Sequence, residues 1–325
     1  MNKLLFKSKN LIVVATVGIT SWYAGSNFER SRAKINQCFC ERGNGNSQIK
    51  YLPGLPVFAT VSAATVVQPP QDYENRLVPI GDPTSQMLTQ SSKYGFMGLD
   101  TIRTFDDYVL SYDRRNKVPN WVFEHLTAER LSYNDKVDRS KCEFTEDELI
   151  HKYFRSTNKD YKGSGFDRGH LAAAGNHRLD QKHCEQTFYL SNIAPQVGNG
   201  FNRHAWNRLE KYIRKLTRFY PHVYVCTGPL YLPKIEPDGK KYIKYQVIGA
   251  KEVAVPTHFF KVVVMETNKG EYHLESYVMP NQVINDEIPL TSFRVPPETI
   301  EIHSGLLFLD KLQKQRLVKV NGIKQ

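Results

Sequence analysis

The order of helical and extended segments restricts the fold of this chain more than any other feature. Residues 201–219 form the clearest helical pattern, since large apolar side chains recur at helical spacing at Trp206, Leu209, Ile213 and Leu216. Pro and Gly residues separate the four strand-like runs that follow, Val223–Cys226, Tyr242–Ile248, Phe259–Glu266 and Tyr272–Met279. Because helices and strands do not alternate regularly, we expect an α+β fold with mixed, mainly antiparallel sheet layers flanked by helices.

Shorter signals predict further elements on either side of that region. Asp107–Ser111 and Trp121–Leu126 are β-rich runs joined by a charged stretch that contains Asn, which predicts a hairpin. Thr145 with Glu148 three residues later has the form of a capping box, so we expect a short helix through about Lys152. The Pro296–Pro297 pair predicts the start of a last short helix.

Changes in composition divide the chain into four parts. Residues 41–92 are rich in Gly, Pro, Ser, Gln and Asn and predict a linker with an N-terminal arm. They separate a terminal segment, 1–40, from a folded domain at 93–310 that begins near Tyr94. Residues 311–325 form a basic tail, which we expect at the periphery of the domain.

The first 36 residues have the features of a targeting or anchoring segment. Three lysines and no acid precede Leu11–Gly25, an apolar run shorter than the roughly 20 residues that span a bilayer. A secretory signal, a mitochondrial targeting segment and a short membrane anchor all fit this pattern. Arg30 and Arg32 follow the run, and the first acid is Glu29, so the charge pattern favours mitochondrial import.

The charge of the chain favours an anionic partner. Lys and Arg number 44 against 33 acids, a formal net charge of +11, of which the chain after residue 36 keeps +6. A basic body suits nucleic acid or acidic lipid without choosing between them. The five cysteines are few, odd in number and scattered, which excludes a disulfide framework.

The residues that carry chemistry lie between Arg139 and Glu210. Asp167, Arg168, Gly169 and His170 follow one another in this stretch. An imidazole is mostly neutral at pH 7 and can accept a proton from water, while the planar guanidinium of Arg168 suits phosphate oxygens. By itself this tetrapeptide is more often a turn with an ion pair than a catalytic site.

Oxygen-bearing side chains on the predicted long helix suit a magnesium ion. Asn202 lies near the start of the helix, and its amide oxygen is a hard ligand of the kind that Mg²⁺ prefers. Glu210 is eight residues further on, about 12 Å along the axis on roughly the same side. Both can therefore serve one metal only if it lies alongside the helix. His177, His183 and Cys184 lack zinc-site spacing and are interpreted as structural.

Several stretches, taken together and in order, resemble the DNA/RNA non-specific endonuclease family, whose members share a ββα-metal site. Within this family the chain resembles the mitochondrial branch. The resemblance covers roughly residues 90–310. Its closest stretches are Tyr108–Asn116, Gly163–Ala174, Asn192–Val197, Thr227–Pro233 and Val255–Lys261.

This resemblance implies roles for the residues that match the family's motif. His170 stands at the position of the general base, and Asn202 at that of the direct magnesium ligand, with Mn²⁺ as a substitute. Glu210 matches the acid that holds a metal-bound water.

Four further positions match the family's pattern. Asp167 and Asn192 correspond to polar positions around the base and the metal. Arg168 and Arg139 correspond to arginines that bind the scissile phosphate.

The resemblance also implies the activity and its setting. Members hydrolyse double- and single-stranded DNA and RNA to products with 5′-phosphate and 3′-hydroxyl ends, and they act as homodimers. The mitochondrial branch resides in the intermembrane space, where the N-terminal segment can contact the inner membrane, and it is associated with nuclear relocation and DNA degradation during cell death.

We therefore expect a Mg²⁺-dependent, sequence-non-specific endonuclease. The alternative from another class is a non-catalytic, membrane-tethered nucleic-acid-binding protein that has kept the fold. A metal-independent phosphatase and a zinc protein are weaker alternatives. Loss of activity with a chelator separates these hypotheses, since Mg²⁺ held by one amide and by water is easily removed.

Overall fold

The structure of the chain is a computed structural model, and it describes residues 101–308, 312 and 314–325. The expected segments 1–40 and 41–92, and the expected start of the domain near Tyr94, lie outside the described residues. No helix within the described part is long and apolar enough to cross a membrane.

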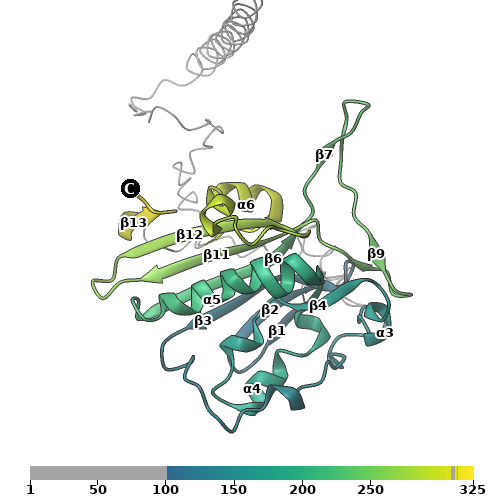
Figure 1. Cartoon of the computed structure of the whole chain (residues 1–325), viewed down its shortest axis with the longest axis horizontal. Helices are drawn as coiled ribbons and strands as arrows, with labels where there is room; N and C mark the ends of the chain where they lie inside the picture. Colours follow the sequence, from purple (N-terminus) through teal and green to yellow (C-terminus); the bar gives the residue numbers. More distant parts are fainter. Residues whose placement is uncertain (1–100, 309–311, 313) are drawn as a thin grey trace, which may run out of the picture. The chain divides into compact units, whose positions relative to one another are not determined.

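An eight-stranded sheet forms the centre of the folded unit, in the order β1-β2-β3-β6-β11-β12-β13-β14 (Figure 1). The strands are β1 (Ile102–Thr104), β2 (Tyr108–Asp113), β3 (Val118–Leu126), β6 (His222–Leu230), β11 (His258–Glu266), β12 (Tyr272–Pro280), β13 (Leu317–Val320) and β14 (Ile323–Lys324). Neighbouring strands are antiparallel except β12 and β13, which are parallel. The expected α+β class with a mixed, mainly antiparallel sheet is confirmed.

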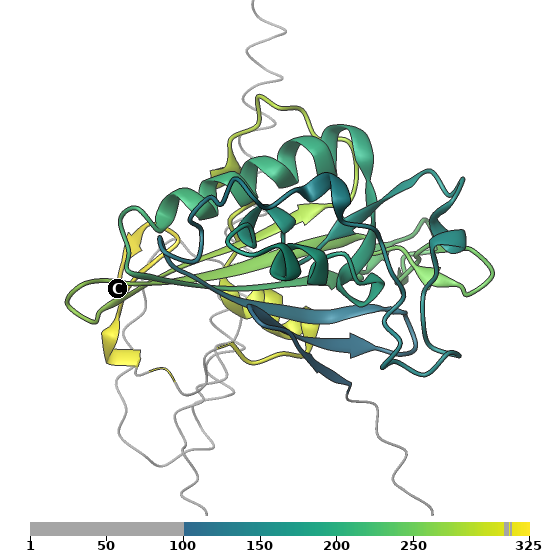
Figure 2. The same ribbon diagram turned by 90° about the horizontal axis from the view of Figure 1, so that it is seen from below.

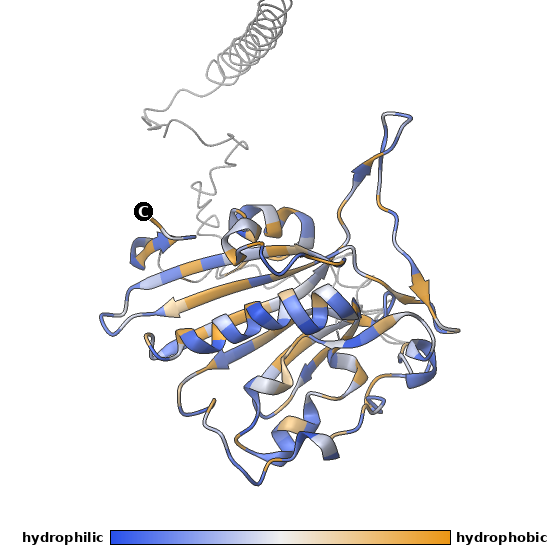
Figure 3. Cartoon of the chain, viewed as in Figure 1, coloured by the Kyte–Doolittle hydropathy of each residue, from blue (hydrophilic) through white to orange (hydrophobic). Residues whose placement is uncertain are grey.

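Helices cover both faces of this sheet (Figure 2). Helix α5 (Asn207–Leu216) lies on one face, and α6 (Pro297–Ser304) lies on the other. A hydrophobic core lies on each face of the sheet, and alternate residues of β11 point into one or the other. Phe259 and Val263 pack in the core on the α5 side, whereas Val262 and Val264 pack with Ile300 of α6. Two buried faces explain why most of the residues of β11 are apolar, although it carries the buried Lys261 (Figure 3).

A smaller unit lies on the α5 side of the sheet. Strands β4 (Phe166–His170) and β5 (Ile193–Val197) form an antiparallel pair that places His170 opposite Ile193. The helical segment η5 (Gly198–Trp206) follows β5 directly and leads into α5. Two strands and a helix thereby meet at one place, in a ββα arrangement.

Short elements complete the unit. They are η2 (Arg139–Lys141), α3 (Asn158–Tyr161), η3 (Ala174–Asn176), α4 (Gln181–Gln186), η4 (Leu190–Asn192), β7 (Lys234–Ile235), β8 (Lys241–Tyr242), β9 (Val247–Ile248), β10 (Val253–Ala254), η6 (Leu290–Phe293) and η7 (Lys314–Arg316).

Most of the predicted regular elements are present. The predicted hairpin is β2–β3, and the helix predicted over residues 201–219 is the end of η5 together with α5. Two expectations are wrong.

The helix expected from Thr145 to Lys152 does not form. The backbone of Thr145 instead accepts a hydrogen bond from Leu190 and donates one to Phe188. Asp147 is buried and accepts hydrogen bonds from Arg103 and Ser191. These long-range partners hold Thr145 in a β-bridge and leave the residues after it in a turn. A capping box does occur nearby, between Thr157 and Asp160 of α3.

The single strand expected at Tyr242–Ile248 is also wrong. The run is divided between β8 and β9, which pair with β7 and β10 in two small separate sheets. Its apolar residues Ile243, Tyr245 and Val247 are exposed, because this part of the chain extends from the main sheet as a long loop (Figure 1).

The basic tail contributes two strands to the main sheet. Strand β13 pairs with β12 and then turns into β14. The side chain of Asn321 in this turn accepts a hydrogen bond from Ser276 N and donates one to Val295 O, at 2.9 and 2.8 Å.

Candidate active site

A cavity of about 430 Å³ opens where β4, η5 and α5 meet. Charged and polar side chains dominate its wall. The lining residues are Arg139, Phe144, Asp167, Arg168, His170, Ala173, Ala174, Gly175, Phe188, Asn202, Arg203, Asn207 and Glu210. Six of the seven predicted site residues therefore share one cavity; Asn192 is the exception.

His170 is the last residue of β4, and it is held as a neutral imidazole. Burial lowers its pKa to about 3, and the positive charges of Arg139, His177 and Arg168 act in the same direction. Its Nε2 atom is buried without a hydrogen-bond partner among the described residues. The imidazole is therefore free to accept a proton.

Two aromatic rings hold His170 in place. Phe188 meets the imidazole edge-on, with centroids 4.7 Å apart, and Phe144 lies against it at 5.3 Å. Neither ring was predicted from the sequence, because Phe188 and Phe144 lie 18 and 26 positions from His170 and belong to no motif of their own. They account for the burial that keeps the imidazole neutral.

Asp167 positions the residues at the start of the helical segment. It accepts two hydrogen bonds from Arg203, at 2.8 and 2.6 Å, and one from Asn202 Nδ2 at 3.0 Å. Burial alone raises the pKa of Asp167, but these donors outweigh it and hold the pKa below its usual value. A Cβ at Gly198 would lie 2.8 Å from the same carboxylate, so a larger residue at this position would displace the Asp167 side chain. The pairing of Arg203 was not predicted.

A hydrogen bond to Asp167 fixes the orientation of the Asn202 side-chain amide. Because Nδ2 donates to Asp167, the amide oxygen is turned away from that carboxylate, and no described residue donates a hydrogen bond to it. Glu210 lines the same cavity from α5, so the site lies alongside the helix, as a shared metal requires. Burial raises the pKa of Glu210, although Lys261 and Arg214 oppose this shift.

Arg139 and Arg168 bring two guanidinium groups to the cavity. Arg168 stacks over Phe144 at 4.2 Å and donates a hydrogen bond to Asn158 Oδ1. Arg139 lies 5.8 Å over the ring of Phe188. Stacking on aromatic faces leaves the edges of a guanidinium available to anion oxygens.

Asn192 is fully buried behind the cavity. Its side chain accepts a hydrogen bond from Ala172 N at 2.9 Å and donates to the carbonyl oxygens of Ala172 and Thr187. These three bonds fix the backbone that follows His170. Asn192 therefore supports the base from behind and does not face the cavity.

Beneath the site lies a layer of buried charge. Glu124 accepts hydrogen bonds from Asn176 at 2.8 Å and from His177 at 2.9 Å. Arg214 donates to the other end of the Asn176 amide. Burial alone lowers the pKa of His177, but hydrogen bonds to Asp107 and Glu124 and their negative charges raise it to about 9. His177 is thus structural, as expected, and carries a positive charge at neutral pH.

The described residues contain no group of three or more His, Cys, Asp or Glu side chains that suits a metal ion. The oxygens of Asn202 and Glu210, together with water, nevertheless form the kind of donor set that Mg²⁺ accepts.

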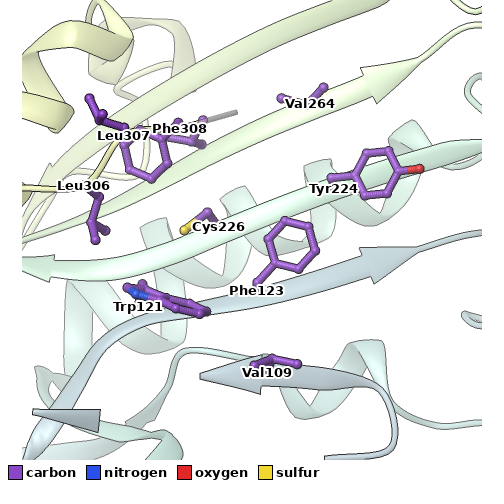
Figure 4. Close-up of a pocket in the computed structure, with 10 residues that line it drawn as sticks. Val109, Trp121, Phe123, Tyr224, Cys226, Val264, Leu306, Leu307 and Phe308 are labelled. Carbon is purple, nitrogen blue, oxygen red and sulfur yellow. The ribbon is translucent and has the colours of Figure 1, made fainter. Parts of the chain in front are cut away.

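A second hollow, of about 440 Å³, lies on the other face of the sheet (Figure 4). Figure 4 shows that its wall is made of aliphatic and aromatic side chains, among them Trp121, Phe123 and Phe308. None of its lining residues is charged, so the first cavity is the stronger candidate for acid–base chemistry.

A neutral imidazole, two guanidinium groups and outward-facing oxygens in one cavity are the parts needed to bind and cleave a phosphate ester. Together with the ββα arrangement, they define a nuclease type of site.

Comparisons with known proteins agree with this class. A family model described as DNA/RNA non-specific endonuclease matches residues 89–315, and the chain belongs to this family. The chain is therefore an endonuclease.

Two relatives and one solved structure are particularly similar. The Homo sapiens protein named Endonuclease G, mitochondrial, is 56% identical over 221 residues, covering 68% of this chain and 73% of the human protein. Its Caenorhabditis elegans namesake is 48% identical over 279 residues, covering 83% and 90%. The solved structure is described as that of the EndoG/EndoGI complex; its matching chain is 64% identical, with a TM-score of 0.69, covering 73% of this chain and 97% of that chain.

Proposed function

We propose that this endonuclease hydrolyses DNA and RNA in a Mg²⁺-dependent reaction, with His170 as the general base, and leaves 5′-phosphate and 3′-hydroxyl ends. The observation that carries the proposal is a neutral imidazole placed beside two arginines and two oxygen-bearing side chains in one cavity.

Arg139 and Arg168 bind the scissile phosphate in this proposal. Their charges help to depress the pKa of His170 in the free protein, after burial itself. A bound phosphodiester neutralises part of that positive charge, so the pKa of His170 rises when substrate binds. The imidazole thus becomes a stronger base only in the complex, where water is to be deprotonated.

His170 then takes a proton from a water molecule that lies in line with phosphorus. The water oxygen bonds to phosphorus as the bond from phosphorus to the 3′-oxygen breaks, which leaves the 5′-phosphate and a 3′-oxyanion. The oxyanion takes a proton from solvent water to become the 3′-hydroxyl, and His170 later releases its proton to solvent. Asp167 keeps Asn202 and Arg203 oriented throughout, and Asn192 fixes the backbone behind His170.

Asn202 would hold the metal directly, and Glu210 would hold its water shell. When bound, Mg²⁺ supplies electrostatic stabilisation of the charge that develops on the phosphate and on the leaving oxygen. Glu210 serves this purpose as a carboxylate. Burial raises its pKa, and the positive charges of Lys261 and Arg214 oppose that rise.

The proposal includes the setting of the enzyme. The relatives' printed names support a mitochondrial location. Residence in the intermembrane space and relocation to the nucleus during cell death are further parts of the proposal. A homodimer, and contact of the N-terminal segment with the inner membrane, belong to the same proposal. So does an inhibitor protein, since the similar solved structure is described as an inhibition complex.

Nicking of supercoiled plasmid by the purified chain tests the proposed chemistry. We expect cleavage with Mg²⁺, none with excess chelator, and a loss of at least about a hundredfold in Asn202→Ala. The products should accept a 3′-end label without phosphatase treatment. Tight DNA binding with no cleavage under any condition would instead support the non-catalytic alternative.

A further inference from the structure

Two buried cysteines lie in contact behind one wall of the active site. Cys142 follows η2, and Cys184 is in α4; their sulfur atoms are 3.5 Å apart. Both are free thiols, with exposed fractions of 9% and 0%. The sulfur atoms of a disulfide are about 2.05 Å apart. The two sulfur atoms therefore need to move only a short distance toward each other to form a bond.

The surroundings of the pair favour such an approach. Cys142 and Cys184 share a small apolar cluster with Val137, Ala174 and Phe188. Gln181 donates a hydrogen bond to the sulfur of Cys142 at 3.6 Å. No ion pair has to be broken to bring the two sulfur atoms together.

The pair is also joined to the site by short lengths of chain. Arg139 is three residues before Cys142 and Phe144 is two residues after it, and both line the cavity. Phe188 is four residues after Cys184 and contacts both His170 and the guanidinium of Arg139. Any movement of Cys142 toward α4 is therefore transmitted to the wall that holds the base and the phosphate.

We propose that Cys142 and Cys184 form a site of reversible oxidation: a disulfide between them draws the Arg139–Phe144 segment toward α4 and slows phosphodiester cleavage. The effect on cleavage rests on the proposed function, whereas the formation of the bond does not.

A peroxide is the oxidant that fits the site, because it is small enough to reach a sulfur that is only slightly exposed. Cys142 attacks hydrogen peroxide, giving a sulfenic acid and one water. Cys184 then displaces hydroxide from that sulfur, and the proton of the Cys184 thiol completes a second water. Two thiols and one peroxide thus yield one disulfide and two waters.

The thiols should react slowly near neutral pH. Burial raises the pKa of Cys142 to about 12, and the contact with Cys184 contributes in the same direction. Since the thiolate is the reactive form, oxidation should accelerate as the pH rises from 7 to 9.

The bond shortens the sulfur separation by about 1.5 Å. Displacements of this size at a catalytic site cost rate, so we expect kcat/KM on plasmid DNA to fall about tenfold or more. The cross-link also closes the chain between residues 142 and 184, which restricts the unfolded state, so Tm should rise by roughly 5–10 °C.

The test uses the full chain, first reduced and then treated with dilute hydrogen peroxide, with catalase added to end the reaction. Peptide mass mapping after alkylation reports the Cys142–Cys184 cross-link, and nicking rate and Tm are measured on the same samples. We expect all three changes to reverse with dithiothreitol. Cys184→Ala should show none of them, whereas Cys226→Ala, which removes a cysteine outside the pair, should behave as the wild type.

Three results overturn the proposal: no cross-linked peptide, a cross-link without a change in rate, or an equal peroxide-dependent loss of rate in Cys184→Ala. A reduced protein that never cleaves DNA contradicts the proposed function instead. In that case the mass and Tm measurements still decide whether the disulfide forms.

Discussion

At the scale of single residues, the burial of His170 is the feature that most shapes the site. An imidazole in contact with two phenyl rings and near two arginines cannot hold a proton at neutral pH, so it is available as a base. Its chemistry then depends on the anion that binds beside it.

Replacing this base should remove chemistry and leave binding. His170→Ala is expected to lower the cleavage rate by about 10²–10⁴-fold, because no other group in the cavity takes over the proton. Filter binding of DNA in the presence of chelator should change by less than about threefold, since Arg139 and Arg168 remain. Cleavage near the wild-type rate would show that His170 is not the base.

His177 should make the stability of the protein depend on pH. Its pKa of about 9 in the folded state lies above the unfolded value near 6.5, so its contribution is complete below pH 6.5 and is lost as the pH rises through 9. That contribution is on the order of 2–3 kcal/mol. Urea unfolding at pH 6, 7.5 and 9 measures it directly.

His177→Gln should be less stable than the wild type at pH 6, with a much smaller decline between pH 6.5 and 9. His303 is exposed on α6, and His303→Gln should keep the wild-type decline. An unchanged slope in His177→Gln would mean that another group controls this pH range.

At the scale of elements, local signals in the sequence were reliable where tertiary contacts agreed with them. The helical spacing of Trp206, Leu209 and Ile213 predicted the helix because those residues pack in the core. The capping pattern at Thr145 failed because Asp147 is drawn into buried contacts with Arg103 and Ser191, which no local pattern reveals.

The hydrogen bonds of Asn321 are expected to anchor strands β13 and β14 to the rest of the domain. Asn321→Ala removes the hydrogen bonds to Ser276 and Val295 and leaves their backbone groups without this partner. We expect a loss of about 2 kcal/mol, or roughly 4–8 °C in Tm, with the cleavage rate at 25 °C unchanged. Lys319→Ala, at an exposed position of β13, should leave Tm within about 1 °C. Equal Tm values for the two variants would show that the turn does not anchor the tail.

At the scale of the whole molecule, much of the candidate site could be predicted from sequence, and its surroundings could not. His170 lies on β4, and Asn202 and Glu210 lie on the consecutive segments η5 and α5, which follow β5, the strand that pairs with β4. Phe144, the Arg203–Asp167 pair and the charge layer around Glu124 depend on contacts between distant segments. Asn192 was predicted near the base, but its position behind the cavity required the structure.

The net charge of +11 should control how the enzyme meets its substrate. Binding through phosphates releases counterions, so affinity for DNA and RNA should fall steeply with salt and vary little with base sequence. Arg139→Ala and Arg168→Ala should each reduce the slope of log affinity against log salt by about 1, measured with one duplex between 50 and 200 mM NaCl. Slopes identical to the wild type would place the phosphate elsewhere.

The ββα unit supplies the base, its neighbouring arginine and the candidate metal-binding oxygens from one continuous stretch, residues 166–210, whereas most of the sheet comes from sequence on either side. Sequence change is therefore partitioned. Substitutions in the flanking strands act mainly on stability, and substitutions of the reactive side chains within the stretch act on catalysis. The exceptions are Arg139 and Phe144, which line the site from outside the stretch, and His177 within it, which affects stability. The stretch can therefore be inherited largely as a block while most of the strands around it diverge.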